Sequence, residues 1–252
     1  MNKTSLFNIL KELEGNELVQ KEVRKNFTDN LWWPSSIDDP YLRLLIGGLS
    51  SRVSYSMIDT YRVVIFRLAE SGYKAICSMS DDELRELIRP LGLFNTRVSY
   101  IRSMIQFISQ KSSLFEKWSD EVFIEEIAQN VKNASYKIGQ CCVLYYRMYP
   151  NKVMPIDSGM RDVLLPCLGF GSNRSAFGHE IMRKELTNAA MEVACDYLKY
   201  TKLDYLNNQN FYWWIHLSLI YYKRIYCNKK DINNCIFKTK EVITCCECMT
   251  TL

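Results

Sequence analysis

Apolar residues recur at helical spacing along nearly the whole chain, and this feature most restricts what the chain can fold into. One stripe consists of Ile58, Tyr61, Ile65 and Leu68, and steps of three and four residues bring side chains to one face of a helix. Alternating strand patterns are scarce, and neither Asn-Gly nor Asp-Gly occurs in the sequence to mark a tight hairpin. We therefore predict an all-α protein.

Local signals also place several helix boundaries. Ser80-Asp-Asp-Glu83 has the capping-box pattern, in which serine and glutamate satisfy each other's backbone amides at a helix start. Another helix is expected to begin near Ser119-Asp120. No internal repeat or low-complexity linker divides the chain. Because the turns between helices are short, the helices are expected to pack as a compact, largely antiparallel body.

Length and composition restrict the class of protein further. A chain of 252 residues can bury a real core as one large domain or as two small ones. No apolar run approaches the length of a membrane span, and the N-terminus lacks the apolar region of a signal peptide. We expect a monomeric cytoplasmic protein with no membrane partner, associated with the nucleoid if the source is prokaryotic. The net charge of +4 is compatible with nucleic acid but does not establish it.

The loop that ends at Asp157 contains the strongest candidate for chemistry. Pro150 and Pro155 mark a turn-rich segment that delivers this carboxylate to the start of a predicted helix. A carboxylate in such a place can stabilise a positively charged, oxocarbenium-like sugar and orient an attacking water. It can equally be an ordinary helix N-cap. The local sequence alone favours the cap.

Three segments together resemble a known family. The loop Met154-Pro-Ile-Asp157, the segment Trp32-Trp33-Pro34 and the turn Leu91-Gly-Leu-Phe-Asn95 resemble the helix-hairpin-helix DNA glycosylases of the endonuclease III superfamily, over roughly Leu31 to Tyr226. Members of this family excise damaged bases with an aspartate, and Asp157 occupies its place. Many members carry His, Asn or Tyr two residues later, where this chain has Gly159. The Gly-Leu-Phe-Asn turn supports the fold more than the chemistry.

The resemblance implies two helical domains with a helix-hairpin-helix motif and a cleft between them. Residues 41–150 would form the central domain with the hairpin. Residues 1–40 and 151–226 would form the second domain, and residues 227–252 a cysteine-containing tail. Helical periodicity by itself does not indicate this discontinuous arrangement.

The hairpin departs from the family pattern. Members usually carry Gly-x-Gly there, whose backbone amides grip a DNA phosphate, and the resemblance places Ala134 and Tyr136 at the two glycine positions. A tyrosine does not adopt a positive φ cheaply. An ordinary polar turn between helices is the alternative interpretation. The residues assigned to DNA binding in this stretch are Lys132, Tyr136, Lys137 and Gly139.

The lysine nucleophile of the bifunctional members is also missing. That lysine forms a Schiff base that leads to strand cleavage, and Ile138 matches its position here. The resemblance therefore predicts a monofunctional enzyme without lyase activity.

Two further positions follow from the resemblance. Many members have a glutamine that fills the gap left by an extruded base, and Arg52 stands in its place as a second DNA contact. Arg52 could equally bind the phosphate of a small nucleotide or be a plain surface residue. Trp32 and Trp33 match the base pocket of the 3-methyladenine glycosylase branch, where a cationic alkylated base stacks on electron-rich rings. The alternative for this pair is burial in a hydrophobic core.

Cysteines cluster near the C-terminus, where endonuclease III relatives bind a [4Fe–4S] cluster through C-x6-C-x2-C-x5-C. The matching residues are Cys227, Cys235, Cys245 and Cys248, with Cys246 beside them. The first spacing is one residue too long, and no C-x2-C follows, so the ligands lack the separations that a cluster needs. We favour a rearranged loop without a cofactor over an intact cluster. Zinc bound through Cys245, Cys246 and Cys248 is less favoured still.

The leading hypothesis is a monofunctional base-excision DNA glycosylase that acts on duplex DNA, with alkylated purines as the favoured lesions. One alternative is an N-glycosidase that acts on a small modified nucleoside or nucleotide. Another is a catalytically silent DNA-binding relative in which Asp157 is only a cap. His179 and His216 lie outside any metal or triad pattern, so structural roles are expected for both.

Overall fold

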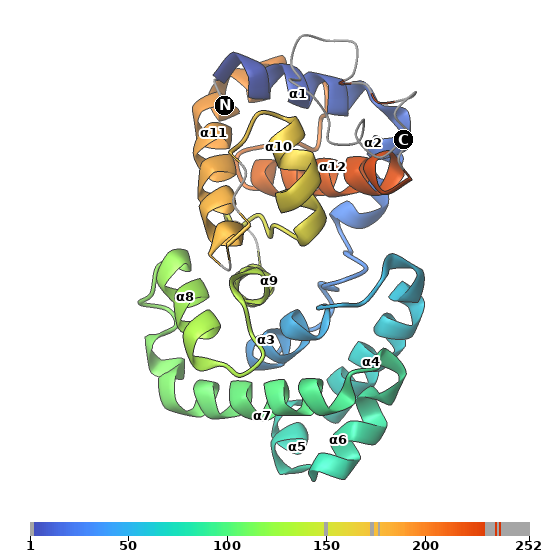
Figure 1. The fold of residues 1–252 in the computed structure, drawn as a ribbon, viewed down its shortest axis with the longest axis vertical. Coiled ribbons are helices and arrows are strands. Elements are labelled where there is room, and N and C mark those ends of the chain that lie inside the picture. The colour runs from blue at the N-terminus through green and yellow to red at the C-terminus, as the bar shows by residue number, and fades with distance from the viewer. Residues whose placement is uncertain are drawn as a thin grey trace. The chain divides into compact units, whose positions relative to one another are not determined.

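The structure, a computed structural model, describes residues 3–148, 151–171, 174–175, 177–229, 235 and 237. These residues form helices and connecting turns without any strand, which confirms the all-α prediction (Figure 1). The α-helices are α1 Lys3–Gly15, α2 Glu17–Phe27, α3 Pro40–Leu49, α4 Ile58–Ser71, α5 Tyr73–Ser78, α6 Asp81–Ile88, α7 Phe94–Lys111, α8 Asp120–Asn130, α9 Tyr136–Arg147, α10 Leu165–Cys167, α11 Gly178–Tyr200 and α12 Phe211–Ile225. Single 3₁₀ turns and one π-helical turn, Met160–Leu164, lie between or after them.

The predicted helix starts are confirmed at two positions. Ser80 and Glu83 form both bonds of the capping box, the Glu83 amide donating to Ser80 Oγ and the Ser80 amide donating to Glu83 Oε2. Ser119 caps α8 by accepting the amide of Val122 at 3.3 Å. Each bond satisfies a backbone donor that the first turn of a helix would otherwise leave without an acceptor.

The chain divides into two compact units. One unit consists of Met1–Thr28 together with Tyr149–Leu252, and the other is Asp29–Met148. The first unit contains α1, α2 and α10–α12, and the second contains α3–α9.

Residues 29–40 belong to the central unit, which therefore starts earlier than the boundary at Tyr41 that the sequence analysis proposed. The cause is a set of buried bonds to backbone carbonyls of this segment. Tyr61 donates its hydroxyl to Trp32 O at 3.1 Å, and Tyr145 donates to Pro34 O at 2.9 Å. These two bonds join the segment to α4 and α9 of the central unit.

In the central unit, α9 lies between α3 and α8 (Figure 1). Two glycines permit these close approaches. A Cβ on Gly47 of α3 would lie 2.9 Å from Cys142 Cα in α9, and a Cβ on Gly139 of α9 would lie 2.7 Å from Ile124 O in α8. The predicted apolar face of α4 is buried in this core, at Ile58, Tyr61, Ile65 and Leu68.

In the other unit, α12 is buried along almost its whole length and packs against α2. Trp214 in the middle of α12 is fully buried, and its indole donates to Gln20 Oε1 of α2 at 3.3 Å. Tyr197 of α11 stacks on the same indole, with ring centroids 5.5 Å apart. This aromatic core fixes α12, which contributes one side chain to the candidate site.

Candidate functional site

Asp157 lies where a buried apolar loop meets a helix. Residues 153–156 are buried, whereas the Asp157 side chain keeps 31% of its surface exposed. Its Oδ1 accepts the amide of Met160 at 2.7 Å, which is the N-cap geometry. Its Oδ2 accepts from Lys223 Nζ of α12. The carboxylate is thus held on both oxygens but remains accessible to solvent.

Lys223 is almost completely buried, with 8% of its side chain exposed. An ammonium group at such a site is stabilised only if it is paired, and Asp157 supplies the opposite charge. Lys223 projects from a helix that is otherwise rich in aromatic residues. Sequence reasoning missed this residue, although a cation in a helix without a polar face was a usable signal.

Gly159 explains how the lysine reaches the aspartate. A Cβ at position 159 would lie 2.9 Å from Lys223 Nζ and 3.0 Å from Lys223 Cδ. The space that a larger residue would occupy two positions after Asp157 is therefore taken by the lysine. Gly159, which departs from the family pattern, thus leaves the space that Lys223 occupies.

A π-helical turn, Met160–Leu164, begins three residues after Asp157. The amide of Arg161 donates to Asp157 O at 2.9 Å, and the amide of Leu165 donates to Met160 O, one residue farther than in an α-helix. Single π turns inside helices are found frequently at functional sites. Here the turn lies beside the candidate carboxylate.

His179 supports the same loop from α11. Its Nδ1 lies 2.6 Å from Ile156 O, and its Nε2 lies 3.0 Å from Arg161 Nη1. Because the carbonyl can only accept and the guanidinium can only donate, these partners assign the proton to Nδ1 and leave Nε2 as the acceptor. Arg161 in turn pairs with Asp162, and this hydrogen bond lowers the pKa of the Asp162 carboxyl. The structural role predicted for His179 is therefore to hold the residue before Asp157.

The two tryptophans differ in exposure. Trp32 is buried, with its ring 5.2 Å from that of Tyr61, whereas Trp33 is half-buried. Both backbone amides donate to Asn30 Oδ1, which fixes the turn. Trp32 therefore packs in the core of the central unit, and Trp33 has the more accessible ring.

Arg52 is exposed and has a left-handed backbone, with φ of 55°. It follows the end of α3 and precedes the 3₁₀ turn Tyr55–Met57. A non-glycine residue adopts this conformation at some cost, so the surrounding structure must hold it there.

The hairpin between α8 and α9 contains a left-handed residue, but not at the positions the resemblance indicated. Asn133 has φ of 61°, whereas neither Ala134 nor Tyr136 has a positive φ. Asparagine tolerates this conformation better than most residues. The turn is closed by the amide of Ala134, which donates to Val131 O at 3.1 Å. The strain expected for Tyr136 is therefore absent, because the turn is one to three residues earlier.

The four residues assigned to this hairpin differ in their access to a ligand. Lys132 is exposed, and Tyr136 and Lys137 are half-buried. Gly139 is buried, and its amide donates to Ser135 O at 2.8 Å inside the helix. Its close approach to α8 gives this glycine a packing reason, and its assignment as a DNA contact stays a prediction. Ile138, at the position of the family's lysine nucleophile, is buried as well.

The cysteine tail is only partly within the described residues. Cys227 and Cys235 are half-buried, and Cys235 Sγ lies 3.1 Å from the Tyr222 hydroxyl. The remaining cluster candidates, Cys245, Cys246 and Cys248, lie outside the described part. Within that part, no three His, Cys, Asp or Glu side chains gather as a metal site would require. Nor does any helix there have the length and apolarity needed to cross a bilayer.

Comparison with known proteins shows a structural relationship but no sequence relationship. No family model matches the sequence, and no curated protein matches it by sequence. Among solved structures, the fold is similar to the crystal structure of the H. pylori 3-methyladenine DNA glycosylase MagIII bound to 1,N6-ethenoadenine, with a TM-score of 0.62 and 15% sequence identity. The match covers 87% of this chain and 97% of that one. The predicted resemblance to helix-hairpin-helix glycosylases is thereby confirmed for the fold.

Proposed function

We propose that this protein is a base-excision DNA glycosylase that hydrolyses the N-glycosidic bond of a damaged base in duplex DNA, with Asp157 as the catalytic carboxylate. The observation that carries the proposal is the partly exposed Asp157, ion-paired with Lys223 in a chain that shares the fold of a 3-methyladenine DNA glycosylase. A partly exposed carboxylate held by a lysine suits a reaction that develops positive charge on a sugar.

The proposed reaction needs only water and protein groups. As the C1′–N bond breaks, its electron pair leaves with the base, which departs neutral if the lesion is cationic and otherwise takes up a proton from solvent. The sugar acquires oxocarbenium character that Asp157 stabilises. Water attacks C1′, and its proton passes to Asp157 and then to solvent. Lys223 and the Met160 amide act as positioning groups that hold the carboxylate in one orientation.

Alkylated purines remain the favoured substrates. A base that carries a positive charge leaves as a neutral molecule and is attracted to the face of an aromatic ring. Trp33 is half-buried and Trp32 is buried, so Trp33 is the better candidate for stacking. Trp33→Ala should therefore lower the rate for a cationic lesion more than for a neutral one. Equal losses for both lesion classes would remove Trp33 from the pocket.

We propose that the enzyme is monofunctional. Ile138 has no amine, and Lys223 is almost completely buried and ion-paired with Asp157, which withdraws its amine from attack on a sugar. Borohydride treatment during turnover should trap no covalent protein–DNA adduct. If an adduct forms and is lost in Lys223→Arg, then Lys223 is an amine nucleophile and the assignment is wrong.

The proposed DNA contacts of the central unit are Arg52, Lys132, Tyr136 and Lys137. Lys132 lies beside the left-handed Asn133 and one turn before the N-terminus of α9, where the helix dipole favours an anion such as a phosphate. Leu93 and Phe94 are exposed apolar residues at the start of α7, with 48% and 38% of their surface accessible. Apolar residues beside cationic ones suit a surface that meets both bases and phosphates.

Two alternatives have specific support and specific tests. The altered hairpin favours a small modified nucleotide as the substrate. Duplex binding across several phosphates weakens steeply with salt, whereas binding of one nucleotide does not. The Asp157–Met160 cap favours a silent DNA-binding relative, in which Asp157→Asn would leave DNA binding unchanged and there would be no base release to lose.

The decisive experiment measures base release from duplex oligonucleotides that carry alkylated, deaminated, oxidised or mismatched bases. Asp157→Asn should lower the rate by a factor of about 10²–10⁴. Asp162→Asn is the matched control, because Asp162 is a nearby carboxylate paired with Arg161 rather than Lys223, and it should retain activity. Release that is equal in wild type and Asp157→Asn would remove Asp157 from catalysis. No release from any lesion by folded wild-type protein would overturn the enzyme assignment.

A further inference from the structure

Arg97 of α7 is buried, with 5% of its surface exposed, and its guanidinium donates to four backbone carbonyls. Nη1 bonds to Leu49 O at 2.6 Å, and Nε bonds to Gly92 O at 2.9 Å. Nη2 bonds to Ser51 O at 3.0 Å and to Leu91 O at 3.3 Å. One nitrogen thus joins the loop after α3 to the turn before α7.

Each joined segment ends in a left-handed, exposed residue. Arg52 follows Ser51 and has φ of 55°, and Leu93 follows Gly92 and has φ of 49°. Such conformations persist only where the surrounding structure determines them. Arg97 bonds to the carbonyl immediately before each of these residues, so it acts on both strained positions at once.

The four hydrogen bonds from Arg97 to backbone carbonyls are called the clamp. Their chemistry favours an arginine over a lysine. Leu49 O lies at the C-terminal end of α3, and Leu91 O lies at the end of a 3₁₀ turn, where unsatisfied carbonyls concentrate negative potential. A planar guanidinium presents donors in several fixed directions, which a lysine ammonium does not reproduce. Burial lowers the pKa of Arg97 from its ordinary value. The guanidinium acts here as a hydrogen-bond donor to backbone carbonyls.

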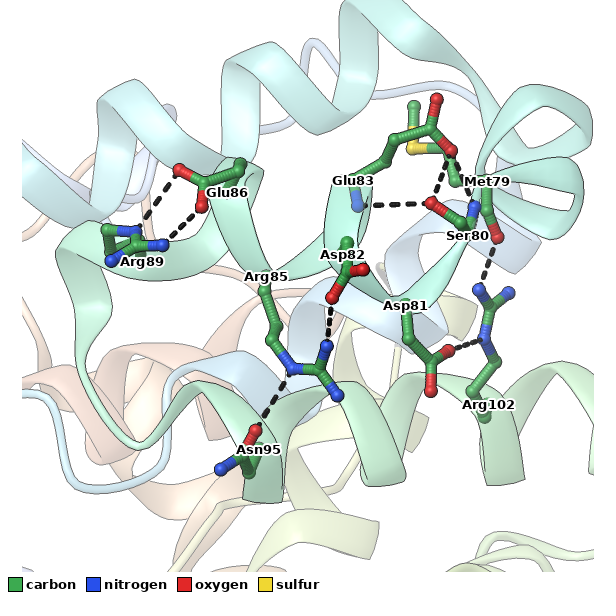
Figure 2. Close-up of polar contacts among 10 residues, drawn as sticks. All are labelled: Met79, Ser80, Asp81, Asp82, Glu83, Arg85, Glu86, Arg89, Asn95 and Arg102. Atoms are coloured by element: carbon green, nitrogen blue, oxygen red, sulfur yellow. Dashed lines mark hydrogen bonds and ion pairs between the residues drawn. The ribbon is translucent and has the colours of Figure 1, made fainter.

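Two further bonds connect the turn at residues 92–96 to its surroundings. Arg85 of α6 donates to Asn95 Oδ1 at 3.1 Å, as Figure 2 shows. Asn133 of the hairpin donates its side-chain amide to Thr96 O at 3.2 Å. The turn therefore links the Arg52 loop on one side to the hairpin with Lys132 on the other.

We propose that Arg97 is a positioning residue that holds Arg52 and Leu93 in place. These two residues would form one rigid surface, called the edge, that contacts duplex DNA. The DNA part of this inference rests on the proposed function. The edge is formed before any ligand arrives, which reduces the ordering cost of binding. Arg97 itself is buried and does not touch the DNA.

The test is a double-mutant cycle on the affinity for duplex DNA. Arg52→Ala should weaken binding about tenfold, as expected for a lost charged contact, and Arg97→Lys should weaken it about fivefold. If Arg97 acts through Arg52, the double variant should lose about tenfold rather than about fiftyfold. Arg102→Lys is the matched control, because Arg102 lies on the same helix but bonds to Asp81 and Met79 O instead (Figure 2).

Amide hydrogen exchange provides a readout that does not depend on DNA. Arg97→Lys should accelerate exchange in residues 49–53 and 90–94 without accelerating the core of α9, and Arg102→Lys should leave both segments unchanged. Losses that multiply in the double variant, or exchange that rises uniformly, would overturn the clamp and indicate a general effect on stability. If the wild type binds no duplex DNA, the DNA part of both proposals fails, and the exchange result alone decides whether Arg97 holds the two segments.

Discussion

Asp157 and Arg97 are fixed in opposite ways. Asp157 is paired with one buried opposite charge, Lys223, on a helix far away in the sequence. Arg97 is bonded to four backbone carbonyls in two neighbouring segments. In the first arrangement the partner is a side chain that mutation can remove, whereas in the second the partners are main-chain atoms that every sequence retains.

The two units therefore hold their residues by different kinds of partner. The unit with Asp157 uses a charge pair, in which a buried lysine holds one oxygen of a carboxylate. The central unit uses a network of donors and carbonyls, which holds backbone geometry without adding another charge to the surface. The charge pair orients one side chain, whereas the carbonyl network orients two backbone segments.

The largest effect on stability is expected from Asp157→Asn. This change leaves the ammonium of Lys223, which is 8% exposed, without its charged partner, and breaking a buried pair in this way costs about 3 kcal/mol. Adding Lys223→Met should restore most of the loss, because the double variant buries no charge. Urea unfolding of the three variants measures both steps. A double variant no more stable than Asp157→Asn would contradict the pairing.

Arg97→Met should cost about 2 kcal/mol, because it removes donors from buried carbonyls. No compensating substitution is expected to restore this loss, since the partners are backbone atoms. The same urea measurement on Arg102→Met should give less than about 1 kcal/mol, because that side chain is 32% exposed and surface ion pairs contribute little. Equal losses of unfolding free energy in Arg97→Met and Arg102→Met would show that the buried bonds to carbonyls contribute no more than a surface ion pair.

Gly159→Ala should separate activity from stability. The new methyl would meet Lys223 Nζ, and the flexible lysine can shift slightly while it stays paired with Asp157. Alanine in a helical turn also gains up to about 1 kcal/mol over glycine, so the free energy of unfolding should stay near that of the wild type. Base release should fall about tenfold as Asp157 loses its fixed orientation. Gly171→Ala, where the nearest atom is 4.0 Å from the added Cβ, should change neither quantity.

The smallest effect on the free energy of unfolding is expected when the pH is lowered. The pKa of Glu83 is lowered by hydrogen bonds from the backbone and hydroxyl of Ser80, and the pKa of Asp162 is lowered by its hydrogen bond from Arg161. Their contributions are complete above the ordinary pKa values of 4.5 and 3.8 and are lost as the pH falls through the lower folded values. Unfolding measured between about pH 5 and pH 3 should therefore show a shallower decline in Glu83→Gln than in wild type. Curves of unfolding free energy against pH that run parallel for wild type and Glu83→Gln would exclude a contribution from the capping box.

Much of the fold could be predicted from local patterns. The capping box at Ser80–Glu83 and the Ser119 cap involve residues three positions apart, so their spacing specifies the bond. The apolar face of α4 follows from helical periodicity for the same reason. The position of Asp157 at a helix start was also predicted, because proline-containing turns are local signals.

The candidate site was predictable only in part. The left-handed residue of the hairpin is Asn133 rather than Ala134 or Tyr136, because the exact end of α8 decides where the chain turns. Trp32 is buried beneath Tyr61, and no local pattern distinguishes a core tryptophan from a pocket tryptophan. Gly139 is explained by the approach of α8, which is a property of packing.

The sequence by itself therefore determined the helical class, several helix boundaries and one carboxylate at a helix start, because neighbouring residues set all three. The tertiary structure decided which groups surround that carboxylate and which hold the exposed loops. Lys223 is 66 residues from Asp157, and Arg97 is 46 residues from Ser51. Pairs at such separations form only when helices pack, so the orientation of Asp157 and the geometry of the Arg52 loop are consequences of the core.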